Sequence, residues 1–347
     1  MAALHLKQSH LKNTEFRSCY RDNRSLAYHG PIMELRQLRY FCAIARCGSF
    51  SKAAGEVFVA QSALSHQLAQ LEEELGASLF HRTRRGVELT EAGRVFHAHA
   101  TAILRQVEDA KASVRNAEGE PSGKVVFGIP HSASNALALP LLQAVRRELP
   151  KVELEITEEL TGNLVPQLRS GQISLAVLFD DGTLDEFQTT PLLDERLSLI
   201  GAASLAGRPK KAVTLKQALA LPLILPAHPH GVRPIIEEAA RRHGLPPPNV
   251  VADISSVSIL RTTLLAGMGY TLLPVMPLQQ DIAAGALCAV PVERPVLTRR
   301  LMLCASKHIP LSGASVAVAR LVFSLTEVLR NSKEGWRGAV LTSDSGK

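Results

Sequence analysis

The sequence predicts a multidomain protein in which a small, all-α-dominated domain is joined by a long helix to a larger α/β region. Short helical patterns fill residues 33–91, and a seven-residue repeat of apolar positions follows them. Beyond residue 123, apolar runs of strand length alternate with helices. With 347 residues, the chain has room for two or three domains of ordinary size.

The composition narrows the class of protein. Hydrophobic residues make up 46% of the chain and charged residues 20%, so sizeable cores can form. Five cysteines are scattered without a Cys-x-x-Cys pair, which argues against a disulfide framework and fits a reducing compartment. No apolar run approaches the roughly 20 residues of a membrane span, and the N-terminus lacks the apolar core of a signal peptide. We therefore expect a cytoplasmic protein without a membrane partner.

The charge distribution gives a weaker signal. A formal charge of +7 fits a polyanionic partner, but it also fits an ordinary solvated basic surface. Residues 33–93 contain seven Lys and Arg and seven Asp and Glu, so nucleic-acid binding there would depend on local clusters. Residues 1–32 are polar and without a sustained period, so we expect a disordered extension or a start wrongly assigned upstream of Met33. A basic arm that grips DNA is the alternative for that segment.

Three helices and a hairpin are expected in residues 33–91. Apolar residues recur at helical spacing from Glu34 to Cys47, and Gly48 ends that helix. A second helix at 52–57 begins after a serine cap, and a third at 61–75 has leucines at intervals of four and three. A small hairpin follows at 79–89. The residues at its tip are Arg84, Arg85 and Gly86.

A long helix is expected from Glu91 to Ala117, within a linker and dimerisation segment at 92–122. Its apolar residues lie alternately four and three apart over three heptads, which is typical of a helix that pairs with another. Packing against its own domain is the alternative, but the helix is too long for so small a domain to cover. The heptad pattern therefore predicts a homodimer. The dimerisation candidates are Phe96, Ile103, Val107, Ala110 and Val114.

The α/β region, residues 123–331, predicts parallel, doubly wound sheets in two lobes. One lobe would combine 123–196 with 301–331, the other would span 197–300, and 332–347 would be a tail. Expected strands are 124–129, 152–158, 175–179, 197–201, 223–225, 250–255, 270–273 and 301–305. Expected helices are 138–148, 164–170, 233–243, 256–266 and 314–329.

No catalytic pattern occurs in the chain. There is no Gly-x-Ser-x-Gly elbow, Walker loop or His-Glu-x-x-His motif. Gly267 and Gly269 precede an expected strand instead of following one, so they end a helix and do not form a dinucleotide fingerprint. His228 and His230 could share a metal in a loop, but two histidines are a weak signal. We expect no enzyme, no cofactor and no metal.

Four motifs carry a resemblance: GSFSKAA at 48–54, QSALSHQ at 61–67, LEEELGASLFHR at 71–82 and LTEAG at 89–93. Along them the chain resembles the N-terminal domain of LysR-type transcriptional regulators. The resemblance extends over residues 33–331 and implies a winged helix-turn-helix, a linker helix and two lobes similar to periplasmic binding proteins. PLILPAHPHGVR and GMGYTLLP resemble the nitrogen-assimilation-control branch more weakly. That branch implies nitrogen or amino-acid metabolism, and some of its members act constitutively, without an effector.

The resemblance places the third helix in the major groove of double-stranded DNA. The helix presents short polar side chains near its start, where a recognition helix meets base edges. Gln61 could read adenine, but Ser62 and His66 depart from the residues usual in the family, so the bases they contact stay open. A solvated helix face is the alternative. The DNA-binding candidates are Ser51, Gln61, Ser62, Ser65, His66, and, for the phosphates or minor groove, Arg82, Thr83, Arg84 and Arg85.

The family also implies a small-molecule effector between the lobes. Hydroxyl-bearing helix starts favour anions, although plain N-capping is the alternative reading of the same residues. We expect an anionic or zwitterionic effector that changes the spacing of DNA-bound dimers. The resemblance further implies that the homodimers assemble into tetramers. RNA polymerase is considered as a further partner. The effector-binding candidates are His131, Ser132, Ser134, Thr161, Asn163, His230 and Ser256.

Overall fold

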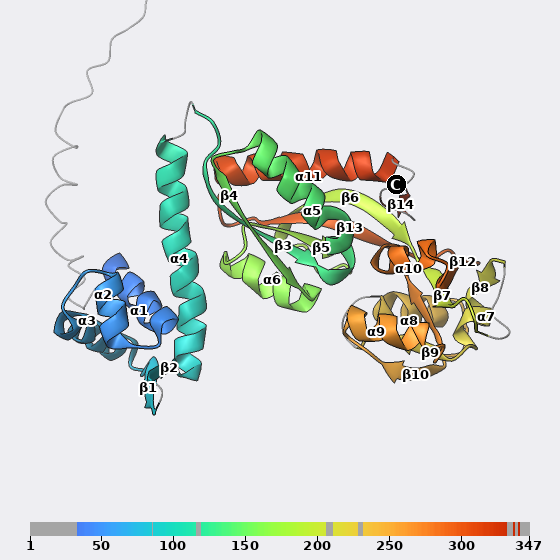
Figure 1. Ribbon diagram of the computed structural model, residues 1–347, viewed down its shortest axis with the longest axis horizontal. Coiled ribbons are helices and arrows are strands. Elements are labelled where there is room, and N and C mark those ends of the chain that lie inside the picture. The colour runs from blue at the N-terminus through green and yellow to red at the C-terminus, as the bar shows by residue number, and fades with distance from the viewer. Residues whose placement is uncertain are drawn as a thin grey trace, which may run out of the picture. The chain divides into compact units, whose positions relative to one another are not determined.

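The computed structural model describes residues 33–84, 86–115, 119–205, 211–227, 232–331, 336 and 339–340. The chain divides into two compact units, the first ending at His97 and the second beginning at Ala98. Figure 1 labels their elements in chain order. The expected extension at 1–32 lies outside the described residues. No helix in the described ranges is long and apolar enough to cross a membrane.

In its described residues, the first unit contains three helices, a two-stranded hairpin and the start of α4 (Glu91–Arg115). Its elements are α1 (Leu35–Cys47), α2 (Phe50–Glu56), α3 (Gln61–Leu75), β1 (Phe80–Thr83) and β2 (Gly86–Leu89). Phe41 is fully buried at the centre, and its ring centroid lies 5.1 Å from that of Phe80. Leu64, Leu68 and Leu71 turn the inner face of α3 towards this core. The leucine spacing of α3 therefore predicted its buried face, except that Leu75 at the end of the helix is 38% exposed.

A close backbone approach fixes the hairpin of the first unit. Gly86 has a φ of 137°, and a Cβ there would lie 2.3 Å from the carbonyl oxygen of Gly48. The Val87 amide donates to that same carbonyl at 3.0 Å. The long helix α4 (Glu91–Arg115) begins next, where the Gly93 amide donates to the Thr90 hydroxyl at 2.9 Å. Glycine is required at position 86 because no side chain fits between these two loops.

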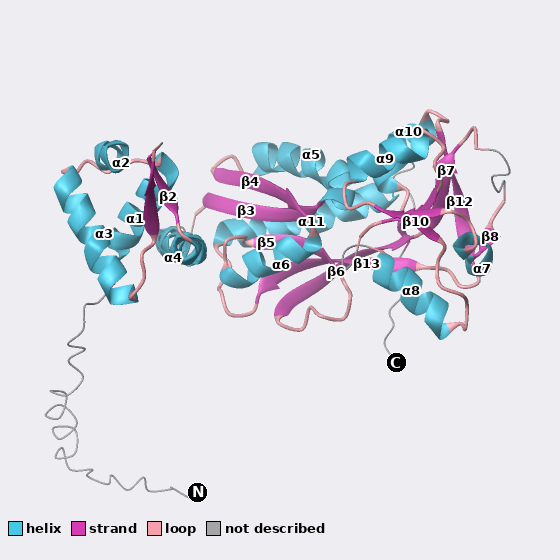
Figure 2. Cartoon of the chain, turned by 90° about the horizontal axis from the view of Figure 1, so that it is seen from below, coloured by secondary structure: helices cyan, strands magenta, loops and turns pink. Residues whose placement is uncertain are grey.

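The second unit contains two six-stranded sheets. The first lobe has the strand order β14-β6-β13-β5-β3-β4. Its elements are β3 (Gly123–Pro130), α5 (His131–Glu148), β4 (Val152–Glu159), α6 (Thr161–Ser170), β5 (Leu175–Phe179), β6 (Phe187–Arg196), β13 (Thr298–Ser306), α11 (Gly313–Asn331) and β14 (Ala339–Val340). Helices α5 and α11 pack on one face of this sheet and α6 on the other (Figures 1 and 2). The central strands β3 and β5 therefore bury side chains on both faces, which explains their continuous apolar runs.

The second lobe has the strand order β10-β9-β11-β7-β12-β8. Its elements are β7 (Ser198–Ala202), β8 (Val213–Thr214), α7 (Leu215–Leu219), β9 (Leu223–Leu225), α8 (Arg233–Arg242), β10 (Val250–Asp253), α9 (Val257–Leu265), β11 (Tyr270–Leu273), the 3-10 turn η1 (Met276–Leu278), α10 (Gln279–Ala283) and β12 (Leu287–Glu293). Leucine, isoleucine and valine side chains form a second core here, separate from that of the first lobe.

Two chain segments connect the lobes. The chain leaves the first lobe between β6 and β7, and returns between β12 and β13. The two segments lie side by side, because the Leu197 amide donates to the Leu297 carbonyl at 2.9 Å and Thr298 is paired with Arg196. The first lobe is thereby assembled from two segments distant in the sequence, whereas the second lobe is one continuous stretch between them.

The expectation of purely parallel sheets was wrong. Strands β4, β3 and β5 are parallel, but β13 runs antiparallel to both β5 and β6. In the second lobe, β7 runs antiparallel to β11 and β12. The strands β6 and β12 were not anticipated, because each contains a proline, Pro191 or Pro291, and proline is rare inside strands.

Two further differences concern the ends of elements. Helices α5 and α6 begin at His131 and Thr161, seven and three residues earlier than expected, because their polar first turns resemble loops. The segment 332–347 is not wholly a tail. Trp336 is buried against the first lobe, and β14 pairs with β6.

Candidate DNA interface and effector pocket

One face of α3 is free of intramolecular packing. The polar residues on this face, which we call the recognition face, are Gln61, Ser62, Ser65 and His66, and all four are exposed. The Ser51 hydroxyl of α2 donates to Oε1 of Gln61 at 2.7 Å. This bond holds the Gln61 amide at the start of α3, with its NH₂ group available to an acceptor. Residues from two helices are therefore arranged on one surface.

The hairpin carries a small group of cations. Arg82 and Arg84 are exposed, and the Thr83 hydroxyl donates to the Gly86 carbonyl across the turn at 3.4 Å. Arg85 lies outside the described residues. Exposed guanidinium groups on a short hairpin can contact phosphates without specifying sequence.

The candidate dimerisation residues of α4 differ in their surroundings. Ile103 is 41% exposed and Val114 is 80% exposed, so both apolar side chains lack full cover within the chain. Ala110 is exposed and Val107 is half-buried. Phe96 instead packs edge-on against Phe41 at a centroid distance of 4.9 Å. Phe96 thus contributes to the core of its own unit, as the alternative interpretation of this segment requires.

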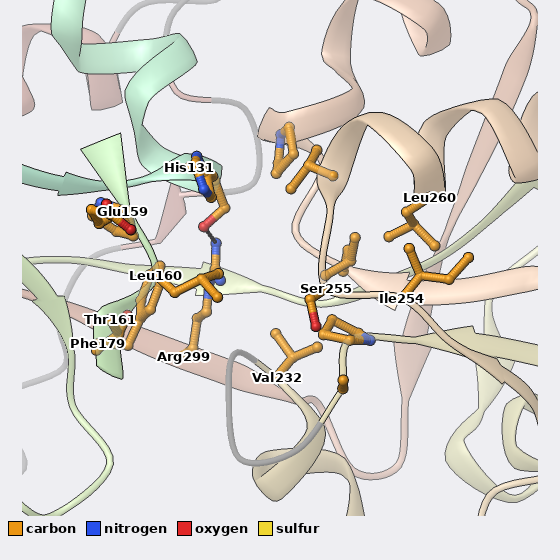
Figure 3. A pocket seen from close by; sticks show the side chains of 17 residues that line it. His131, Glu159, Leu160, Thr161, Phe179, Val232, Ile254, Ser255, Leu260 and Arg299 are labelled. Carbon is orange, nitrogen blue, oxygen red and sulfur yellow. Dashed lines mark hydrogen bonds between the residues drawn. The ribbon is translucent and has the colours of Figure 1, made fainter. Parts of the chain in front are cut away.

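A cavity of about 640 Å³, including its open mouth, lies between the two lobes (Figure 3). Of the residues expected to bind an effector, His131, Ser132 and Thr161 line it. They lie in the first turns of α5 and α6, where backbone N–H groups have no partner within the helix. The N-caps of these helices are Pro130 and Leu160, so neither Ser132 nor Thr161 is a capping residue.

The other expected effector residues are placed differently. Ser134 is buried, and its hydroxyl donates to the His131 carbonyl at 3.0 Å. The Asn163 amide donates to Oε2 of Glu159 at 3.0 Å. Ser256 caps α9 by accepting from the Ile259 amide at 3.4 Å, so the capping interpretation holds for this serine. His230 lies outside the described residues.

The main polar group of the pocket, Arg299, was not anticipated. Arg299 is 3% exposed, and its Nε donates to Oε2 of Glu195 at 2.6 Å. Its Nη2 donates to the Ser132 hydroxyl at 3.1 Å, and its guanidinium lies 3.9 Å from the centroid of the Phe179 ring. Trp336 completes the cluster, because its Nε1 donates to Oε1 of Glu195 at 2.7 Å. Burial lowers the pKa of Arg299, and the charge of Glu195 opposes that shift.

A pattern in the sequence could have revealed this pair. Asp194 and Glu195 form an acidic doublet, Arg299 and Arg300 form a basic one, and both doublets stand in apolar runs. In the sheet, Arg299 is paired with Glu195 and Arg300 with Asp194. Alternation along a strand then directs one ion pair to each face of the sheet. The strand β6 was not predicted from the sequence, so Asp194 and Glu195 were not placed opposite the two arginines.

The two sides of the pocket differ in chemistry. The first lobe contributes the helix starts, Arg299 and the carboxylate-bearing Glu159, whereas the second lobe contributes mainly apolar side chains. Those apolar residues are Pro226, Ala227, Val232, Ile254, Val257, Leu260, Leu273 and Pro277. A ligand that spans the pocket would therefore meet hydrogen-bond donors at one end and hydrocarbon at the other (Figure 3).

These features define a class of protein: a helix-turn-helix unit with a winged hairpin, followed by a two-lobed ligand-binding region. Two family models match the chain. Residues 35–94 match the bacterial regulatory helix-turn-helix protein, lysR family, and residues 118–326 match the LysR substrate binding domain. The chain belongs to the LysR family of DNA-binding transcriptional regulators, which are not enzymes.

Similar proteins span nearly the same length. The nitrogen assimilation regulatory protein nac of Klebsiella aerogenes is 35% identical over 300 residues, which cover 84% of this chain and 95% of that protein. The regulator BbuR of Bordetella bronchiseptica is also 35% identical, over 80% of this chain and 85% of its own. A solved full-length OxyR variant from Pseudomonas aeruginosa covers 90% of this chain and 99% of that one at 23% identity, with a TM-score of 0.65. The resemblance to the nitrogen-assimilation-control branch, noted from short motifs, is supported by the first of these.

Proposed function

We propose that this regulator binds DNA as a dimer through the recognition face and the hairpin, and that a small molecule in the lobe pocket controls its action. The domain limits proposed are 33–91 for DNA binding, 92–122 for the linker and dimerisation helix, and 123–331 for effector binding. Ile103, Val107, Ala110 and Val114 remain the proposed dimer contacts. The observation that carries the proposal is the largely apolar pocket between the lobes, whose polar groups come mainly from the first lobe.

The chemistry of the pocket suggests the class of effector. Arg299 is neutralised by Glu195, so it offers directed N–H donors more than net charge. The first turns of α5 and α6 add the positive ends of two helix dipoles. We therefore favour a small carboxylate or zwitterion with an apolar body, such as an apolar amino acid or its keto acid.

The relatives suggest where the regulator acts. Similarity to the nac protein favours genes of nitrogen or amino-acid metabolism. Binding to chromosomal DNA requires a cytoplasmic location, and RNA polymerase is a proposed partner at the promoter. The competing hypothesis is a constitutive regulator of such genes, in which the pocket takes no effector.

The effector proposal predicts the behaviour of Thr161→Val. The substitution removes a hydroxyl from the pocket at nearly constant side-chain volume. It should lower the affinity for the effector about tenfold, the usual effect of losing one hydrogen bond to a charged group. DNA affinity without effector should stay within about threefold of wild type. Calorimetry of the full chain with a panel of amino acids and keto acids would first identify the ligand. The same ligand would then be titrated into the variant.

Thr189→Val provides the matched control, because Thr189 is exposed on β6 and does not line the pocket. It should bind the ligand as wild type does. If Thr161→Val binds the ligand with wild-type affinity, the start of α6 does not contact the ligand. If no compound in the panel binds the wild-type protein, the constitutive hypothesis replaces the effector hypothesis.

The hairpin predicts a salt effect. Arg84→Ala combined with Arg85→Ala should weaken binding to every duplex and reduce the slope of log K against log salt by about two, since each phosphate contact contributes about 0.9. Arg146→Ala combined with Arg147→Ala on α5 makes the same change in net charge at exposed positions of the other unit. That control should leave the slope unchanged. Equal slopes for the hairpin variant and wild type would exclude the hairpin from the DNA interface.

A further inference from the structure

An apolar side chain stands uncovered beside the recognition face. Phe58, in the turn between α2 and α3, is 94% exposed, the highest exposure of any large hydrophobic residue among those described. The aromatic rings of Phe41, Phe50, Phe80 and Phe96 in the same unit contact one another, whereas Phe58 joins none of these pairs. Folding of this unit therefore gains little from the phenyl ring, since a side chain left in water contributes no apolar burial.

The backbone at Phe58 also disfavours a side chain. Its φ is 56°, a left-handed conformation that glycine, which has no Cβ, adopts far more readily than phenylalanine. The surrounding hydrogen bonds are those of a helix end that usually carries glycine, with the Val59 amide donating to the Ala54 carbonyl at 3.0 Å. Glycine would serve the turn better than phenylalanine. A strained, exposed aromatic residue at this position calls for a role outside folding.

The location of Phe58 indicates that role. Gln61 begins α3 only three residues later, and the Ser51 hydroxyl ties Gln61 to α2 on the other side of the turn. The start of a recognition helix is the part that enters the major groove, so the preceding turn lies at the groove edge. The apolar group that DNA presents in this groove is the thymine methyl.

We propose that Phe58 is a DNA-contact residue that packs its ring against a thymine methyl group beside the bases met by Gln61. The inference rests on the proposed DNA interface and adds an apolar, sequence-selective contact to its polar ones. The strain at position 58 is then retained because the ring is used in the complex, where it becomes buried. Sequence reading missed this residue, since a single phenylalanine between two helices resembles a core position.

Phe58→Gly separates binding from folding. Glycine relieves the backbone strain, so the variant should melt no lower than wild type. Its affinity for a duplex enriched by the full chain from a random-sequence pool should fall on the order of tenfold. Affinity for an unselected duplex should change less than threefold. Phe58→Leu, which keeps an apolar side chain, should retain part of the affinity.

Replacing the thymines of the selected duplex by deoxyuridine tests the partner atom. The wild-type protein should bind the deoxyuridine duplex more weakly than the thymine duplex. Phe58→Gly, which has already lost the methyl contact, should bind the two duplexes equally. Equal losses for both proteins would overturn the assignment to thymine. An unchanged affinity of Phe58→Gly for the selected duplex, or a changed sedimentation coefficient, would overturn the DNA contact.

The selection experiment with the wild-type protein distinguishes a failure of the proposed function from a failure of the Phe58 contact. If wild type enriches no sequence from the pool, the proposed function fails, and the Phe58 contact fails with it. If wild type enriches a sequence and the hairpin arginines show the expected salt effect, a Phe58→Gly variant of full affinity refutes only the inference about Phe58.

Discussion

Arg299→Met should lower the free energy of unfolding of the two-lobed unit by about 3–5 kcal/mol. The substitution keeps an unbranched side chain of similar length but leaves the buried Glu195 carboxylate without its cation, and a buried charge without an opposite charge is costly. The chain contains a single tryptophan, Trp336, which donates to the same carboxylate. Urea unfolding followed by tryptophan fluorescence would therefore report directly on this cluster.

Two comparisons show whether the cost arises from the buried charge. Arg169→Met removes the cation of an exposed pair with Glu186, so it should lower the free energy of unfolding much less than Arg299→Met does. Adding Glu195→Gln to Arg299→Met removes the buried charge, so the double variant should recover much of the lost stability. If Arg299→Met costs no more than Arg169→Met, the pocket pair contributes nothing to the fold.

Gly93→Ala should unfold or strongly loosen the DNA-binding unit, with a loss of about 3 kcal/mol or more. A Cβ at this position would lie 2.0 Å from the carbonyl oxygen of Leu79, and a backbone atom cannot move aside as a side chain can. That carbonyl already accepts from the Thr90 amide, so the start of α4 must separate from the hairpin. Hydrogen exchange of the amides of α1 and α3 would measure the loss, and DNA binding should fall with it.

Gly55→Ala is the matched control within the same unit. Nothing lies within 4 Å of a Cβ at Gly55, which is inside α2, and alanine favours a helix by about 1 kcal/mol over glycine. This variant should therefore be slightly more stable than wild type. Equal protection of amides in the two variants would mean that the hairpin accommodates the clash.

The sequence predicted the first unit more fully than the lobes, for a physical reason. Helices α1 to α3 depend on residues three and four apart, and their buried faces are visible as a local period. The strand β6 shows no such pattern, because it contains Pro191 and four consecutive exposed residues. Without β6 and β12, the remaining strands looked parallel, so the mixed sheets could not be inferred.

The pocket shows the same division between local and distant information. His131, Ser132 and Thr161 were predicted because strand ends followed by helix starts can be read from neighbouring residues. The Arg299–Glu195 pair joins positions 104 residues apart and depends on the register between β13 and β6. A single sequence does not specify that register when one of the two strands goes unrecognised.

The two segments that connect the lobes lie against each other. The Leu197 amide donates to the Leu297 carbonyl, so a change in the angle between the lobes would bend both segments at the same place. Such an arrangement favours a hinge movement. Arg299 and Glu195 lie two residues from Leu297 and Leu197, next to this hinge. A ligand bound at Arg299 would therefore act close to the hinge, where a small change of angle becomes a larger displacement at the far ends of the lobes.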